Sequence, residues 1–193
     1  GEYNNLLVAP VSLKNTLLDL IKEEIEKAKA GEETSIFLKM NSLTDRQLID
    51  ALKEASQAGV KIKMIIRGIC CILPGIEGKT DNIEVISVVG RFLEHSRIFC
   101  FATGENMKMY IASADWMTRN TENRVEIAAP IYDQKIKNSI YDTLRIMWKD
   151  NLKARILCSD GTYKKPEIKE GDELIDCQNY LRHEYKVGRK IKL

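Results

Sequence analysis

The sequence predicts an α/β domain in which helices flank a mixed β-sheet. Short β-branched runs alternate along the chain with longer segments in which apolar residues recur at helical spacing. A strand–helix–strand unit over 35–66 is followed by strand-like segments joined by short turns, a pattern typical of mixed sheets. The chain has 193 residues and no linker-like stretch, so we expect one domain over 1–193.

The first half of the chain combines short strands with two helices. Pro10 ends the first strand, Gly31 ends the first helix, and Thr44 is the expected N-cap of the second helix. A glycine-punctuated loop over 68–79 separates the last two strands. The predicted elements are a strand over 6–8, a helix over 12–31, a strand over 35–40, a helix over 44–58, and strands over 60–66 and 83–89.

The second half opens with two strands joined by a turn at 103–106. A later helix presents Ile136, Ile140 and Leu144 on one face, and the residues after about 164 are more polar. The predicted elements are strands over 96–101, 107–113 and 124–128, a helix over 132–151, an edge strand over 154–158, a short helix over 171–185 and a basic tail over 186–193.

Composition excludes several classes of protein. The net charge is +2 and 44% of the residues are hydrophobic, which excludes a disordered chain and gives no general attraction to nucleic acid. No apolar run approaches the length of about 20 residues that spans a bilayer, and the first residues lack the pattern of a signal peptide, so we expect none. The five cysteines lack the spacing of a zinc site, so we expect reduced thiols and a cytoplasmic location, with peripheral attachment to an inner membrane as a variant.

The two histidines differ in their surroundings. His183 lies in a polar segment and is expected to be a solvated surface residue, whereas His95 has arginines close by in the sequence. These are Arg91, Arg97, Arg119 and Arg124. Guanidinium groups match phosphate oxygens bidentately, so such a cluster with one histidine indicates phosphoryl chemistry. The alternative is that the arginines form surface ion pairs with Glu94, Asp115, Glu122 and Glu126.

Other residues favour structural roles. Cys70 and Cys71 follow a strand and are expected to be buried, unreactive thiols. The loop over 74–78 lacks a P-loop pattern, so we interpret it as a surface loop near a nucleotide. Trp116 is expected in the core.

A series of sequence blocks resembles one known family. The blocks are Asn41–Asp45, Ala55–Val60, Arg67–Cys71 with Pro74–Ile76, Gly90–Arg97 and Ser113–Met117 with Arg119–Asn120. In this order they resemble the C-terminal domain of bacterial polyphosphate kinase. The matched blocks lie between about Leu6 and Tyr163, and we assign residues 1–163 to the family. Residues 164–193 are expected to form a polar tail with a short helix.

The resemblance implies a phospholipase D-like three-layer domain. The signature of that superfamily is H-x-K, four residues, D, and later G-S-x-N. Here His95-Ser96-Arg97 keeps the spacing with arginine in place of lysine, and Ala102 stands at the aspartate position. The later element corresponds to Ala112-Ser113-Ala114-Asp115. These departures argue against phosphodiesterase activity and leave a phosphate-binding scaffold.

The resemblance also implies a reaction and its residues. The family transfers the γ-phosphate of ATP reversibly to inorganic polyphosphate through a phosphohistidine, with Mg²⁺ accompanying ATP and no protein-borne metal ligand in this chain. The phosphorylated histidine belongs to a preceding domain. His95 matches the second, catalytic histidine, and Arg67 and Arg124 match phosphate-binding arginines, with Glu126 as a residue that could orient His95. Lys39 and Asn41 are further candidates at a strand end.

The expected partners are ATP or ADP, polyphosphate, the preceding domains and, in the full enzyme, further copies of the chain. Alone, the domain is expected to bind these ligands weakly without turnover. Two alternatives remain open at the level of sequence. One is a phospholipase D-superfamily phosphodiesterase or nuclease in which two copies of His95 meet in a dimer. The other is a non-catalytic polyphosphate- or nucleotide-binding module. The basic tail over 186–193 is either a guide for polyphosphate or a solvated tail.

Overall fold

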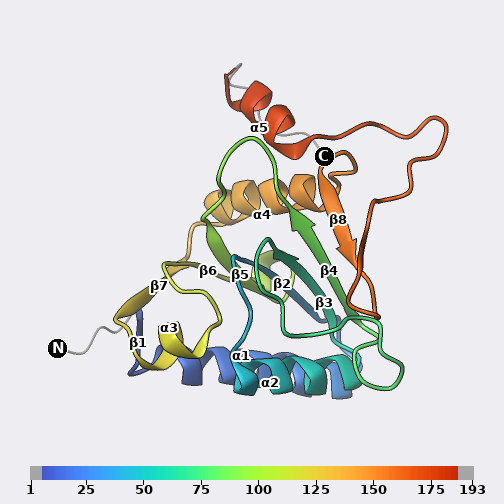
Figure 1. The fold of residues 1–193 in the computed structure, drawn as a ribbon. Helices are drawn as coiled ribbons and strands as arrows, with labels where there is room; N and C mark the ends of the chain where they lie inside the picture. The colour runs from blue at the N-terminus through green and yellow to red at the C-terminus, as the bar shows by residue number, and fades with distance from the viewer. Residues whose placement is uncertain (1–5, 187–193) are drawn as a thin grey trace.

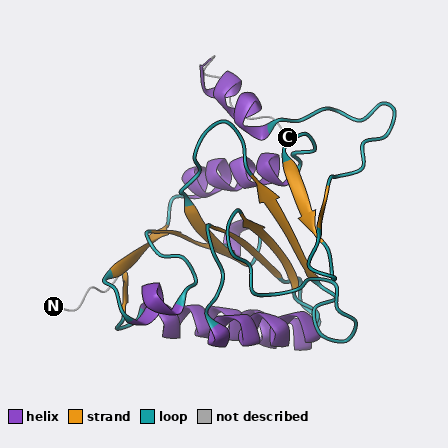
Figure 2. Ribbon diagram, viewed as in Figure 1, coloured by secondary structure: helices purple, strands orange, loops and turns teal. Residues whose placement is uncertain are grey.

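A computed structural model of the chain describes residues 6–186 and shows helices on both faces of one sheet (Figures 1 and 2). The strands are β1 (Leu7–Ala9), β2 (Ser35–Met40), β3 (Lys61–Ile66), β4 (Ile83–Val88), β5 (Arg97–Phe101), β6 (Lys108–Ala112), β7 (Glu126–Ile131), β8 (Ala154–Leu157) and β9 (Tyr163–Lys164). The helices are α1 (Leu13–Lys29), α2 (Arg46–Gln57), α3 (Thr118–Glu122), α4 (Gln134–Trp148) and α5 (Cys177–Lys186), with one 3₁₀ turn at Gly104–Asn106. None of these helices is long and apolar enough to cross a membrane.

The sheet has the strand order β1-β7-β6-β5-β2-β3-β4-β8-β9. Strands β2, β3 and β4 are parallel to their neighbours in this group, and β5, β6 and β7 continue from β2 in antiparallel fashion. The parallel strands are central and are covered on both faces, as parallel sheets require. The predicted mixed α/β sheet flanked by helices is therefore confirmed.

Two apolar layers hold the helices to the sheet. Along β2, Ile36, Leu38 and Met40 face the layer that includes residues of α1 and α2. Phe37 faces the opposite layer, which includes residues of α4 and α5. Because side chains alternate across a strand, Lys39 falls on the same face as Phe37. The sequence thus directs one lysine of the central strand into the α4 layer.

One buried carboxylate fixes the helices on the α1–α2 face. Asp45 caps α2 by accepting hydrogen bonds from Gln47 N (3.1 Å) and Leu48 N (3.2 Å). Its second oxygen lies 2.9 Å from Lys14 Nζ of α1 and accepts a 2.8 Å hydrogen bond from Thr121 Oγ1 of α3. The predicted cap, Thr44, is thus wrong by one residue, because the carboxylate of Asp45 satisfies the first free amides of the helix.

Several predicted boundaries differ from the structure. The strand predicted over 124–128 begins at Glu126, because its register is set by pairing with β6 and β1. The strand predicted over 154–158 forms as β8, but the prediction that it is an edge strand is wrong, since β8 pairs with β4 on one side and with β9 on the other. The short helix predicted over 171–185 forms only from Cys177. Most of the predicted basic tail, 187–193, lies outside the described residues.

Candidate functional site

Strand register brings the candidate site residues to one edge of the sheet. Lys39 and Asn41 lie at the carboxyl end of β2, and Arg67 follows β3 immediately. Strand β5 runs antiparallel to β2, with Ile98 opposite Lys39, so that Arg97 enters β5 at this same edge. Residues after β6 return there as well, because Ala112 pairs with Arg97.

A chain of hydrogen bonds joins these residues below the surface. Arg67 donates through Nε to Asn41 Oδ1 at 2.6 Å. Asp115 accepts from the backbone N of Asn41 at 2.7 Å and lies 3.3 Å from Arg97 Nε. Since Asp115 is only 7% exposed, it orients both partners from within the fold. The alternative of ion pairs is thus confirmed for Arg97 and Asp115, but this pair is not at the surface, because the carboxylate is buried.

Gly68 lets Arg67 come this close to Asn41. The Gly68 amide donates to Asn41 O at 2.7 Å, and a Cβ at Gly68 would lie 2.8 Å from the same oxygen. A side chain at residue 68 would therefore force apart the two backbone segments that carry Arg67 and Asn41. The Arg67-Gly68 pair was a sequence signal for this close approach.

Lys39 is the most buried cation of the site. It is 4% exposed, and the cavity beside it is bounded by Arg67, Glu94 and apolar side chains that include Met147. Burial lowers the pKa of Lys39, and Arg67 and Arg97 lower it further, while Glu94 raises it in part. Positive charge is thus concentrated where it is poorly solvated, which favours binding of an anion.

His95 lies at the surface in the loop between β4 and β5. The residues on either side of it are attached to Lys39. Lys39 Nζ donates to Ser96 O at 3.0 Å and lies 3.7 Å from a carboxylate oxygen of Glu94. The imidazole is therefore presented to solvent from a loop that is anchored on the buried lysine.

Arg124 lies further along the same edge. It is exposed and precedes β7, whose first residues return to the end of β6 through the bond from Ser113 N to Ile127 O (2.9 Å). Strands β7 and β3 are four positions apart in the sheet, which is about 19 Å at the usual spacing. Arg67 and Arg124 thus come from segments next to strands that are not neighbours in the sheet.

Glu126 is engaged elsewhere than expected. Its two carboxylate oxygens accept hydrogen bonds from Asn120 Nδ2 (2.7 Å) and from the Ser113 hydroxyl. Within residues 6–186 these contacts hold Glu126 against α3 and the end of β6, so the structure gives no support for its orienting His95. Its neighbour α3, Thr118–Glu122, was missed because five residues are too few to show helical periodicity.

The remaining candidates divide between the core and the surface. Trp116 is fully buried and packs edge-on against Phe99, with 5.4 Å between ring centroids, so its predicted core role is confirmed. His183 is exposed, as expected. Cys70 is half-buried, and burial raises its pKa. The expectation of a buried thiol is wrong for Cys71, which is exposed because it leaves the sheet with the following loop.

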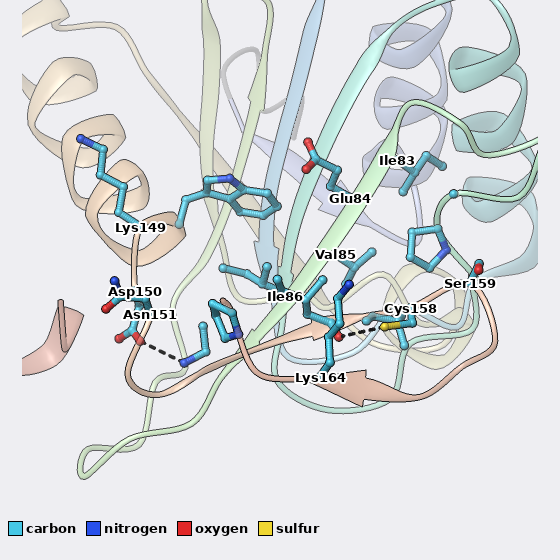
Figure 3. Close-up of a pocket in the computed structure, with 17 residues that line it drawn as sticks. Ile83, Glu84, Val85, Ile86, Lys149, Asp150, Asn151, Cys158, Ser159 and Lys164 are labelled. Carbon is cyan, nitrogen blue, oxygen red and sulfur yellow. Dashed lines mark hydrogen bonds between the residues drawn. The ribbon is translucent and has the colours of Figure 1, made fainter. Parts of the chain in front are cut away.

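A pocket of about 450 Å³ lies away from this edge (Figure 3). It is formed by β4, β8, the turn after α4 and the segment around β9, with Asp150 and Asn151 at one end and Ser159 at the other. None of the candidate residues His95, Arg67 and Arg124 lines it. The pocket is therefore separate from the charged sheet edge, where the buried cations are.

The fold and this edge define the class of protein. The chain has a TM-score of 0.56 to a phospholipase D family member, Nuc, from Salmonella typhimurium, over 83% of this chain and 97% of that one. Identity is only 17%, so this likeness shows the fold alone. The chain is a phospholipase D-like α/β domain.

Closer relatives identify the family. The family model for polyphosphate kinase C-terminal domain 2 matches residues 6–178, and the chain belongs to this family. A polyphosphate kinase from Thermosynechococcus vestitus is 50% identical over 171 residues, which are 89% of this chain and 23% of the relative. The crystal structure of the polyphosphate kinase from Porphyromonas gingivalis superposes with a TM-score of 0.92 at 37% identity, over 97% of this chain and 28% of that one. The chain thus spans about a quarter of the length of these relatives.

Proposed function

We propose that this chain supplies the phosphate-binding half of a polyphosphate kinase active site. The observation that carries the proposal is the buried cluster at the sheet edge. Lys39, Arg67 and Arg97 meet there around one buried carboxylate, Asp115, and the half-buried Glu94. Three cations against two carboxylates leave a net positive site that a phosphate group would neutralise. In the full-length protein the site would take the phosphates of ATP and of inorganic polyphosphate.

The residues of this edge suit different steps of a phosphoryl transfer. Arg67 is held by Asn41 through Nε, so that the terminal nitrogens of its guanidinium would bind and stabilise the transferring phosphoryl group. His95 is exposed beside the cluster and would give or take a proton at the leaving oxygen. The phosphorylated histidine would come from a preceding domain, as the family resemblance implies.

The separation of the arginines suits an extended substrate. Arg124 precedes β7, and β7 lies about 19 Å from β3 along the sheet, a spacing that a polyphosphate chain can span. We infer that Arg67 binds at the reacting end, while Arg124 contacts phosphates further along.

The described residues do not build a magnesium site. No group of three or more acidic, histidine or cysteine side chains among residues 6–186 is arranged to hold a metal. Asp115 is engaged by Arg97, and Glu94 lies beside Lys39. As the family resemblance implies, we propose that Mg²⁺ enters with the nucleotide, and we assign it no ligand in this chain.

The test is polyphosphate synthesis from Mg-ATP by the full-length protein and its variants. We expect His95→Ala and Arg67→Ala each to lower kcat by about 100-fold or more, the usual range for losing a proton-transfer group or a charge-stabilising donor. Arg46→Ala is the control, because Arg46 lies on α2 and its side chain is 93% exposed. Full activity in Arg67→Ala would contradict the assignment.

Binding by the isolated 193-residue chain provides a second test. We expect weak, salt-sensitive binding of polyphosphate by calorimetry, weaker in Arg67→Ala, and no ATP–polyphosphate exchange. Hydrolysis of a chromogenic phosphodiester by a dimer of the chain, lost in His95→Ala, would replace this proposal with a phosphodiesterase. Binding that depends equally on every arginine and not on His95 would instead indicate a non-catalytic module.

A further inference from the structure

Helix α5 is in direct contact with the loop that carries His95. The loop between β4 and β5 arches away from the sheet toward α5 (Figure 1). There Gln178 Oε1 accepts a hydrogen bond from Phe92 N at 2.8 Å, and Gln178 Nε2 donates to Phe92 O at 2.8 Å. The side-chain amide thus pairs with one residue of the loop in both directions, as a neighbouring strand would. Gln178 is 7% exposed, so these bonds are shielded from water.

The same amide reaches the residue before His95. Gln178 Nε2 also donates to Glu94 Oε1 at 3.1 Å, while the other oxygen of Glu94 lies 3.7 Å from Lys39 Nζ. Lys39 in turn donates to Ser96 O. His95 is therefore flanked by one residue attached to both α5 and β2 and by one attached to β2.

The backbone of the loop is shaped for this contact. A Cβ at Gly90 would lie 2.4 Å from Gln178 Oε1 and 2.8 Å from its amide carbon. Any larger residue at 90 would displace Gln178 or the loop. Glycine here is explained by the approach of the glutamine rather than by an unusual φ.

Helix α5 is itself fixed at its first turn. Asp150 is 3% exposed and accepts a 2.8 Å hydrogen bond from Cys177 N. Its other oxygen accepts from Lys153 N at 2.7 Å and Ala154 N at 2.9 Å, which holds the turn between α4 and β8. Asp150 thereby connects the start of α5 to the main body of the domain at the end of the pocket in Figure 3.

We propose that Gln178 is a positioning residue that holds the His95 loop over the cationic edge of the sheet. The inference rests on the proposed function, because it holds that the loop places His95 for phosphoryl transfer. A primary amide offers a donor and an acceptor on two adjacent atoms without charge, which matches the N–H and C=O of one loop residue. A glutamate would lack the donor and place a second carboxylate beside Glu94, and a lysine would lack the acceptor.

The test compares Gln178→Met with Tyr185→Phe in the full-length protein. Gln178→Met keeps the length of the side chain and removes its hydrogen bonds to the loop. Tyr185→Phe removes the 3.2 Å hydrogen bond between Tyr185 and Thr143, which joins α5 to α4, and leaves the loop contacts in place. The readouts are kcat and KM for ATP in polyphosphate synthesis and amide hydrogen exchange of residues 89–96.

For Gln178→Met we expect kcat to fall about 10- to 100-fold, the usual cost of a misplaced catalytic group, with KM for ATP within twofold of wild type. Exchange over 89–96 should become faster in this variant and stay unchanged in Tyr185→Phe. Gly90→Ala should reproduce both effects from the loop side, which guards against a folding defect specific to α5.

Two outcomes would overturn the inference. Unchanged exchange over 89–96 in Gln178→Met would show that the glutamine does not restrain the loop. Faster exchange with wild-type kcat would show that the restraint does not serve catalysis. If the wild-type protein itself makes no polyphosphate, the proposed function fails, and the exchange comparison alone decides whether Gln178 restrains the loop.

Discussion

Removing the charge of Asp115 should reveal how much the buried network contributes to stability. In Asp115→Asn the amide oxygen can still accept from Asn41 N, the 2.7 Å bond. The amide nitrogen, in the place of Oδ2, would face both Arg97 Nη2, now at 3.5 Å, and Asn41 Nδ2, now at 3.4 Å. Donor would then meet donor at these two contacts, and the 3.3 Å contact of Arg97 Nε with the remaining oxygen would lose its charge assistance.

The size of the effect follows from these contacts. A hydrogen bond to a charged group contributes about 1.5–3 kcal/mol, and breaking a buried ion pair costs about 3–5 kcal/mol. Because the contacts of Asp115 with Arg97 are long, we expect the low end, a loss of about 2–3 kcal/mol in the free energy of unfolding. For a domain of this size that corresponds to a fall in Tm of about 4–12 °C.

The assay is urea unfolding of the 193-residue chain, followed by tryptophan fluorescence. Asp142→Asn is the matched control, since it breaks an exposed pair with Arg145 at 3.6 Å on α4. Exposed pairs of this kind contribute about 0.3–0.5 kcal/mol. Equal losses in the two variants would refute the reasoning, because burial would then make no difference to the pair.

Three further predictions concern groups whose surroundings differ sharply. Because the pKa of Lys39 is lowered in the folded chain, the unfolded chain binds more protons between that lowered pKa and 10.5. The free energy of unfolding of the wild-type chain should therefore rise with pH in this window relative to that of Lys39→Met. Urea unfolding at pH 8 and 10 measures the two trends, and parallel trends would contradict the prediction. Maleimide should label Cys71 in the native chain but not Cys100, which is buried with its pKa raised to about 12, as read by peptide mass spectrometry; labelling of both at one rate would disprove it. Trp116→Ala should lower the free energy of unfolding by about 3–5 kcal/mol, since Trp116 is fully buried, and a loss below 1 kcal/mol by urea unfolding would place the ring outside the core.

The elements with strong periodicity could be predicted from sequence. Strand β2, Ser35–Met40, has its predicted bounds, and α1 differs by one or two residues at each end. The start of β7 could not be predicted, because Val125 continues the β-branched pattern of the strand, whereas the pairing with neighbouring strands begins only at Glu126. Local pattern identifies strand-forming residues, whereas register is decided by neighbours distant in sequence.

In the candidate site, too, the sequence indicates individual residues, whereas the contacts between them depend on the fold. Arg67 and His95 could be singled out because each lies in a distinctive block, and the structure places Arg67 in the cationic edge. The partner that holds this edge together, Asp115, is 74 residues from Asn41 in the sequence. Its burial depends on how β6 returns beside β5, and Gln178 reaches the His95 loop only through the docking of α5. Such contacts leave no signal in spacing or composition.

Ala102 bears on whether a phospholipase D signature could be introduced into this domain. By spacing it stands where that signature has aspartate, and it adopts a φ of 66°. Aspartate tolerates that backbone conformation better than alanine does, so the main chain is no obstacle to the substitution. The obstacle is solvation, because Ala102 is 7% exposed and a carboxylate introduced there would need a cation introduced with it. Completing the signature in this domain would therefore take a compensating substitution in the core besides Ala102→Asp.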